Sequence, residues 1–110
     1  MRAFFAAPGE RLITRGEKGT DAFFIASGAV EADTGTALRR LGRGDVFGEM
    51  ALLFDLRRQA DVTVIGYSAL LRLTQADFER FLARHPALRT ELTVIGQRRL
   101  DENAAQRNNL

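Results

Sequence analysis

The stretch from which this sequence is best interpreted is Gly44-Asp45-Val46-Phe47-Gly48-Glu49-Met50-Ala51-Leu52-Leu53-Phe54-Asp55-Leu56-Arg57-Arg58-Gln59-Ala60-Asp61-Val62. It predicts a short strand that ends at Gly48, a short apolar turn of helix, and arginines that lead into a second strand. The free N–H groups at the start of a helix can bind an anion, and glycine lets a ligand approach the backbone closely. The pattern therefore indicates a small anion-binding site.

The strand that follows indicates which arginine faces this site. Apolar residues alternate with polar ones over residues 60–64, so the even-numbered positions are expected to face the interior. Arg58 shares that parity and Arg57 does not. A buried arginine is costly unless it meets an anion, and its planar fork suits two phosphate oxygens. The alternative is an ion pair between Arg58 and Glu49, which would leave Gly48 and the helix start unexplained.

Outward from this stretch, the pattern predicts short strands followed by helices. Turn signals rich in Gly separate short apolar or alternating runs, which is typical of a sandwich or barrel. The predicted strands are 2–5, 11–14, 22–26, 29–33, 37–41, 46–47, 60–65 and 69–73. Thr74 is a predicted N-cap, and helices are expected at about 75–84 and 87–102. The expected fold class is mainly β: an eight-stranded jelly-roll-like barrel over about 2–73 with an inserted short helical segment, followed by two α-helices.

The composition excludes several classes of protein. The 110 residues suit one domain, and 45% hydrophobic with 27% charged residues is typical of a soluble globular protein. There is no cysteine, and His85 is the single histidine, so the several histidine ligands of a metal-dependent jelly-roll enzyme are missing. A net charge of +2 with interspersed acidic residues argues against a nucleic-acid groove. No nucleophile–base pair is visible, so we expect neither an enzyme nor a metal or cofactor site.

The central stretch and four further motifs occur in an order that is specific to one family. Phe47-Gly48-Glu49-Met50-Ala51-Leu52 is followed by Arg58-Gln59-Ala60, and supporting motifs lie at residues 7–10, 16–21, 23–28 and 41–45. Together they resemble the cyclic-nucleotide-binding domain family, which includes catabolite activator proteins, kinase regulatory subunits and cyclic-nucleotide-gated channels. The segment around Gly48 resembles that family's phosphate-binding cassette. The resemblance covers roughly residues 4–100.

The resemblance implies a role for each site residue. The cyclic phosphate would be held by Arg58, Gln59, Ala51 and Leu52, the last two through backbone N–H groups. The ribose would be held by Glu49 and Gly48, because a carboxylate beside a phosphate is useful only if it accepts hydrogen bonds from a neutral hydroxyl. The base and the lid that covers it would involve Val46, Phe47, Met50, Leu92, Ile95, Arg98 and Arg99.

The implied function is regulatory binding of a cyclic mononucleotide, with cAMP as the first expected ligand and cGMP as the second. The last helix would act as a lid that relays the signal to an attached effector, such as a membrane channel or antiporter. Arg57 stands where the family usually has proline, and Gln59 where a small residue is usual, so ligand choice stays open. The alternative is a degenerate fold that acts as a structural or protein-interaction domain and binds no nucleotide.

Residues 1–110 are expected to form a single domain. The family has helical sequence before its first strand, whereas Met1 lies almost on that strand, so we expect the chain to be part of a larger protein. No run of about 18 apolar residues is present, so no membrane insertion is expected. We expect a cytoplasmic location and no contact with nucleic acid. The sequence does not decide between a monomer and a homo-oligomer.

Overall fold

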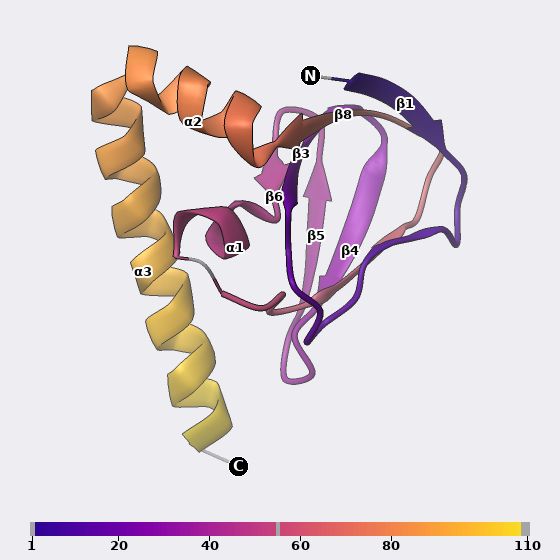
Figure 1. The fold of residues 1–110 in the computed structure, drawn as a ribbon. Helices are drawn as coiled ribbons and strands as arrows, with labels where there is room; N and C mark the ends of the chain where they lie inside the picture. Colours follow the sequence, from indigo (N-terminus) through magenta and orange to yellow (C-terminus); the bar gives the residue numbers. More distant parts are fainter. Residues whose placement is uncertain (1, 55, 109–110) are drawn as a thin grey trace.

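Eight strands and three helices make up the fold, as seen in a computed structural model that describes residues 2–54 and 56–108 (Figure 1). The strands are β1 (Arg2–Ala6), β2 (Arg11–Ile13), β3 (Asp21–Ser27), β4 (Ala29–Asp33), β5 (Leu38–Gly42), β6 (Val46–Phe47), β7 (Asp61–Val64) and β8 (Ser68–Thr74). Every predicted strand is confirmed, and no end differs by more than one residue. The turn signals therefore located the strands correctly.

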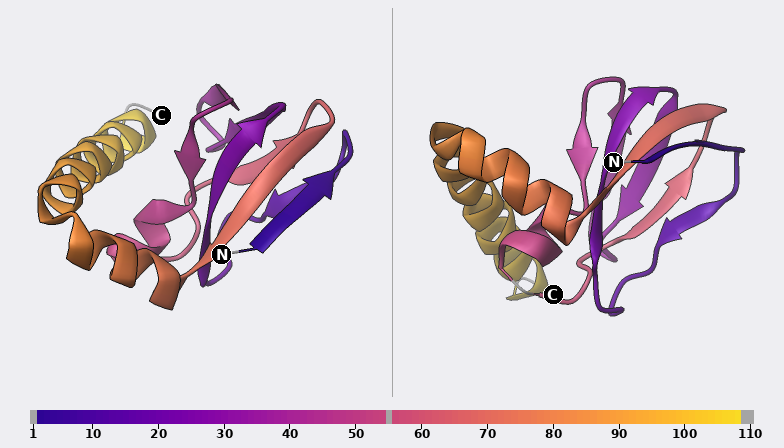
Figure 2. Two further views of the ribbon diagram at one scale, coloured as in Figure 1. Left: turned by 90° about the horizontal axis from the view of Figure 1, so that it is seen from above. Right: turned by 45° about the horizontal axis from the view of Figure 1, so that its top comes forward.

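The strands form two antiparallel sheets of four strands each, in the orders β1-β8-β3-β6 and β2-β7-β4-β5. The expected fold class is confirmed, but the expected barrel is not closed: among the described strands, no ladder joins one sheet to the other. The chain leaves β6 after two residues to form a helix, so this edge offers few backbone groups for further pairing. The molecule is thus a jelly-roll-like sandwich (Figure 2).

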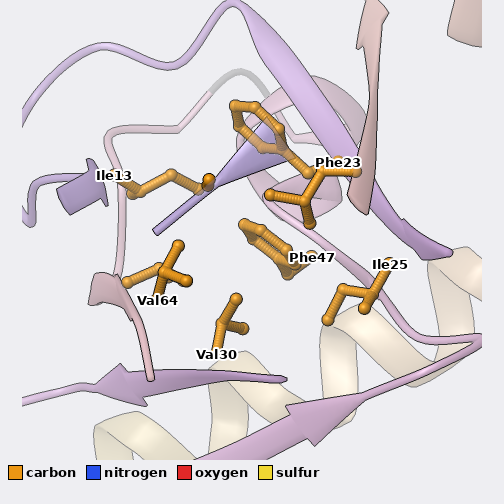
Figure 3. Close-up of a cluster of buried hydrophobic side chains, with 9 residues drawn as sticks. Ile13, Phe23, Ile25, Val30, Phe47 and Val64 are labelled. Carbon is orange, nitrogen blue, oxygen red and sulfur yellow. The ribbon is translucent and has the colours of Figure 1, made fainter. Parts of the chain in front are cut away.

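One apolar core fills the space between the sheets. In β7 the burial alternates as predicted, with Val62 and Val64 facing the interior. They meet Phe23 and Ile25 of the other sheet, and the side chains converge on Phe47 (Figure 3). Phe23 and Phe47 stack with ring centroids 5.1 Å apart. This core fixes the inner surface from which the pocket described below is built.

The helices are α1 (Glu49–Leu53), α2 (Gln75–Arg84) and α3 (Pro86–Asn108). Thr74 caps α2 as predicted, because its hydroxyl accepts a hydrogen bond of 3.1 Å from the Asp77 N–H. The predicted end of the last helix at about 102 is wrong, since α3 continues to Asn108. Residues 103–108 include alanine, glutamine and arginine and no glycine or proline, so a helix that has already formed can extend through them.

A second apolar cluster holds the three helices against β3. Its buried members are Ala22, Leu52, Phe78 and Leu82, and Leu88 and Leu92 of α3 pack against it. Accordingly, α1 lies between the sheets and the two long helices (Figures 1 and 2). None of the helices in the described part of the chain is long and apolar enough to cross a bilayer.

Candidate functional site

A pocket of about 100 Å3 lies where α1 meets the inner face of the β2-β7-β4-β5 sheet. Strand residues on its wall are Ile13, Ala32, Arg39, Leu41, Phe47 and Val62, and Thr34 joins them from the turn after β4. The segment from Gly48 to Ala60 adds Gly48, Glu49, Met50, Ala51, Arg58, Gln59 and Ala60. The wall is therefore mostly apolar, and its ionic groups are two arginines and one glutamate.

Arg58 enters this pocket from the segment just before β7. It faces the interior, as the alternation of polar and apolar residues over 60–64 predicted. Its Nη1 donates to the Gly48 carbonyl at 3.0 Å, and its Nη2 donates to the Asp21 carbonyl at 2.7 Å. The side chain is half-buried. Burial lowers the pKa of Arg58 below its usual value, and the nearby carboxylates of Asp21, Glu17 and Glu49 partly oppose that change. The site therefore holds a partly desolvated positive charge, which favours an anionic ligand.

Two glycines make room for this guanidinium. A Cβ atom built on Gly48 would lie 2.7 Å from Arg58 Nη1, and one on Gly19 would lie 2.6 Å from Arg58 Nε. Gly48 also has a φ of 82°, a left-handed conformation that favours glycine. Gly19 was not predicted as a site residue, although it lies in one of the motifs that carry the family resemblance. The fit around Arg58 is tight enough that any side chain at either glycine would displace it.

Glu49 is the first residue of α1 and lines the pocket although its side chain is only 5% exposed. The backbone N–H groups of the first helical turn, from Glu49 to Leu52, have no partners within the helix itself. In the described part of the chain, every buried side-chain polar atom has a hydrogen-bond partner. Glu49 therefore places a buried carboxylate, which can accept hydrogen bonds, on the same pocket wall as Arg58.

Seven of the predicted site residues line the pocket: Phe47, Gly48, Glu49, Met50, Ala51, Arg58 and Gln59. The Gln59 side-chain amide donates back to the Arg57 carbonyl at 3.1 Å, while Arg57 itself is exposed and donates to the Gly16 carbonyl. These residues come together because α1 and the segment after it fold over one end of the sheet.

The other predicted residues lie elsewhere. Val46 pairs with Phe24 on β3 and is not part of the wall, because successive strand residues face opposite sides. The Leu52 side chain is buried in the helix cluster. On α3, Leu92 packs against that cluster and Ile95 and Arg98 are exposed away from the pocket, while the Arg99 side chain lies outside the described residues. The helix α3 begins at Pro86, and its residues Leu88 and Leu92 pack against the cluster that includes side chains of α1 and α2.

Several wall residues were not predicted, above all Arg39 and Leu41 of β5, Ala32 of β4, which pairs with Arg39, and Thr34 in the turn after β4. The two-residue period of β5 could have indicated that Arg39 and Leu41 share a face. Which face is internal depends on the pairing of β5 with β4. In the part of the chain that the structure describes, no group of three or more His, Asp or Glu side chains could hold a metal ion.

Comparison with known proteins identifies the family. The family model for the cyclic nucleotide-binding domain matches residues 4–85. A putative potassium channel protein of Rhodopseudomonas palustris is 36% identical over 99 residues, covering 86% of this chain and 24% of that protein. A cAMP-dependent protein kinase regulatory subunit of Debaryomyces hansenii is 40% identical over 76 residues, covering 67% of this chain and 17% of that protein. The chain thus spans about a quarter or less of these two relatives.

Solved structures agree with this assignment. A structure described under a cyclic-GMP-dependent signalling pathway that regulates bacterial phytopathogenesis superposes with a TM-score of 0.78 at 31% identity. The match covers 93% of this chain and 85% of that one. The likeness therefore extends over most of both chains. Because the family model covers most of the chain and the fold is shared, this protein belongs to the cyclic-nucleotide-binding domain family.

Proposed function

We propose that this chain is a regulatory domain that binds a purine 3′,5′-cyclic mononucleotide and catalyses no reaction itself. The observation that carries the proposal is the half-buried Arg58, held beside Gly48 and the start of α1 in a pocket that also contains Glu49. An arginine fork and free helix N–H groups suit a phosphate, and a carboxylate beside them suits a ribose hydroxyl. A single site thus provides complementary groups for two parts of one nucleotide.

In this proposal the cyclic phosphate lies against Arg58, the N–H groups of Ala51 and Leu52, and the Gln59 side chain. Glu49 and the backbone at Gly48 bind the ribose. Burial lowers the pKa of Arg58, yet arginine begins so high that the side chain stays protonated at neutral pH. Bound phosphate would offset the desolvation of that charge, so ligand binding stabilises the folded protein.

The last helix is the proposed relay. Leu92 of α3 packs on the same apolar cluster as Leu52 of α1, so movement of α1 on ligand binding would change the surface on which α3 rests. We place Ile95, Arg98 and Arg99 on the part of α3 that closes over the base. An attached effector, such as a channel, an antiporter or a kinase regulatory assembly, would respond to that movement. A cytoplasmic location belongs to this proposal.

The test is calorimetric titration of the purified chain with cAMP and cGMP, compared with an Arg58→Ala variant. The native chain should bind, and Arg58→Ala should weaken binding by roughly tenfold to a hundredfold, because a charge-assisted hydrogen bond is worth about 1.5–3 kcal/mol. Arg57→Ala is the matched control: it removes the neighbouring, exposed arginine and should leave affinity nearly unchanged.

Arg58→Ala also removes donors from two backbone carbonyls, so thermal unfolding of each variant must be measured as well. If Arg58→Ala does not fold, Arg58→Lys keeps the charge without the fork and should still lower the affinity. A well-folded native chain that binds neither nucleotide would contradict the proposal. That result would favour a domain that contacts protein partners only. The sequence favours cAMP over cGMP, and the same titration compares the affinities of the two nucleotides.

A further inference from the structure

The strand β1 ends one sheet and has one unpaired edge. It is the outer strand in the order β1-β8-β3-β6, and among the described residues no strand pairs with its other side (Figures 1 and 2). The other three edge strands are protected: β6 stops after two residues, β2 has three, and β5 carries Arg39 and Arg40. The five residues of β1 include a single charge, at Arg2. The edge of β1 is therefore the one that is open to further pairing.

The backbone groups that face this open edge belong to Ala3 and Phe5. Along a strand, N–H and C=O groups point to alternate sides at successive residues. The N–H and C=O of Ala7, just after the strand, both bond to Glu10 and not to β8, so residues two and four positions earlier also face away from β8. The same alternation follows from β3, where Ile25 bonds on the β6 side and the register extends across β8 to β1.

These four groups fit a second copy of the same strand. In an antiparallel pair, two residues that face each other exchange two hydrogen bonds. With Phe4 on a two-fold axis, Ala3 of each copy meets Phe5 of the other, so all four groups are bonded. An axis at Phe5 would instead place Ala3 opposite Ala7, whose groups are already bonded to Glu10. Among the described residues, the register centred on Phe4 is therefore the one that satisfies the whole edge.

The side chains on both faces of β1 fit this register. Phe5 is 86% exposed on the outer face, and the small Ala3 of the other copy would stand opposite it. The two Phe5 residues would be diagonal neighbours about 7–8 Å apart, a separation that aromatic side chains bridge. On the inner face, Phe4 packs against the sheet core and would meet its own copy at the axis. Pairing would thus cover the largest exposed apolar side chain of the strand.

The charges at the two ends of β1 are complementary. Arg2 begins the strand. Glu10 Oε2 accepts a hydrogen bond of 3.0 Å from the Ala7 N–H, so its carboxylate stands at the open edge just past the other end of the strand. Antiparallel pairing brings the Arg2 end of one copy to the Glu10 end of the other, and the two-fold axis repeats this contact. Opposite charges would therefore meet at both ends of the shared ladder.

We propose that this chain forms a two-fold symmetric dimer in which β1 pairs antiparallel with β1 of a second copy, in the register centred on Phe4. The two outer sheets then continue into one. Each copy has one such edge, so the assembly closes at two copies. One strand per copy makes a small interface, and the dimer is accordingly weak and depends on concentration. No wall residue of the pocket lies on β1, so this inference does not rest on the proposed function.

The first experiment is sedimentation equilibrium of the purified chain between about 10 μM and about 1 mM, a range that suits a small interface. The average mass should rise from 12.2 kDa toward twice that value. Phe5→Lys places two like charges side by side and should weaken association by about tenfold or more. Leu38→Lys is the matched control, because Leu38 is also exposed on an edge strand, β5, and its replacement should leave association unchanged.

The second experiment tests the register by cross-linking, since the chain contains no cysteine. Ala3 and Phe5 are both exposed, so cysteine at either position should not disturb the core. Residues that face each other as a hydrogen-bonded pair have Cα atoms about 5.5 Å apart, which suits a disulfide. A mixture of the Ala3→Cys and Phe5→Cys chains should therefore cross-link faster than either chain alone.

Three results would overturn the inference. A chain that stays monomeric at about 1 mM has no such dimer, and its edge would then be left for an extended segment of another protein. A dimer that Phe5→Lys leaves intact must use a different surface. Faster cross-linking of the Ala3→Cys chain with itself would place the axis elsewhere. If Phe5→Lys fails to fold in thermal unfolding, Ala3→Pro removes an N–H that faces the open edge and should abolish the dimer in its place.

Discussion

Arg58 is held in place by two backbone carbonyls and by the closeness of two glycines, rather than by its charge alone. The carbonyls of Gly48 and Asp21 accept hydrogen bonds from its two terminal nitrogens. A Cβ atom on Gly19 would lie 2.6 Å from Arg58 Nε and 2.7 Å from Ala51 Cβ. The arginine is thus positioned before a ligand arrives, which reduces the entropy lost on binding.

Gly19→Ala should therefore lower nucleotide affinity. The added methyl must displace either the guanidinium, which is the mobile end of its side chain, or α1 at Ala51. We expect a loss of affinity of about tenfold, and a loss of about 1–3 kcal/mol in the free energy of unfolding from overpacking. Calorimetric titration and thermal unfolding would measure the two effects separately.

Gly66→Ala provides the control for this substitution. A Cβ atom on Gly66 would have no neighbour within 4 Å, so the same chemical change should leave both affinity and stability nearly unaltered. Equal effects of the two substitutions would show that Gly19 has no special relation to Arg58.

At the scale of elements, α1 depends on its neighbours for stability. It has five residues, too few to be stable alone. Leu52 anchors it in the cluster formed with Phe78 and Leu82 of α2. The position of α1, and with it the end of the pocket that contains Arg58, therefore depends on the packing of α2. The N-cap of α2 is Thr74.

Thr74→Ala should destabilise the protein by about 1 kcal/mol, because the Asp77 N–H loses the hydroxyl that caps α2. Chemical denaturation would measure this change. Thr93→Ala is the matched control within α3. The Thr93 hydroxyl bonds back to the Arg89 carbonyl on an exposed helix face, and alanine is the better helix former. A comparable loss in both variants would mean that the cap contributes nothing.

The whole molecule consists of a sheet core and a helix cluster, which meet along β3. Residues of β3 contribute to both, with Phe23 and Ile25 in the first and Ala22 in the second. Beyond Leu92, by contrast, Val94 and Ile95 of α3 are exposed. The two ends of α3 are therefore expected to differ in local stability.

Hydrogen exchange should reveal this difference. Amides of β3 and β8 lie in the centre of one sheet and should exchange slowest, while those of α3 after Leu92 should exchange fastest among the helices. Saturating cyclic nucleotide should slow exchange in α1 and in the later part of α3, if that part closes over the base. Protection in α1 without any change in α3 would contradict the proposed lid.

Much of the site could be predicted because its residues lie close together in the chain. Gly48, Glu49 and Arg58 belong to one stretch, and local parity indicated that Arg58 and not Arg57 faces inward. Arg39 could not be predicted, because its place in the pocket depends on the register of β5 against β4. Register joins residues that are distant along the chain, and the spacing within one strand does not specify it.

By itself the sequence determined the order and ends of the strands, the cap at Thr74 and the family, since each depends on turn chemistry, period or a contiguous motif. Only the tertiary structure decided that the sheets do not close and that Gly19 packs against Arg58. It also placed Leu92 in the helix cluster and Arg39 in the pocket wall. The physical reason is that local preferences fix the backbone of each element, whereas packing between elements fixes which side chains meet.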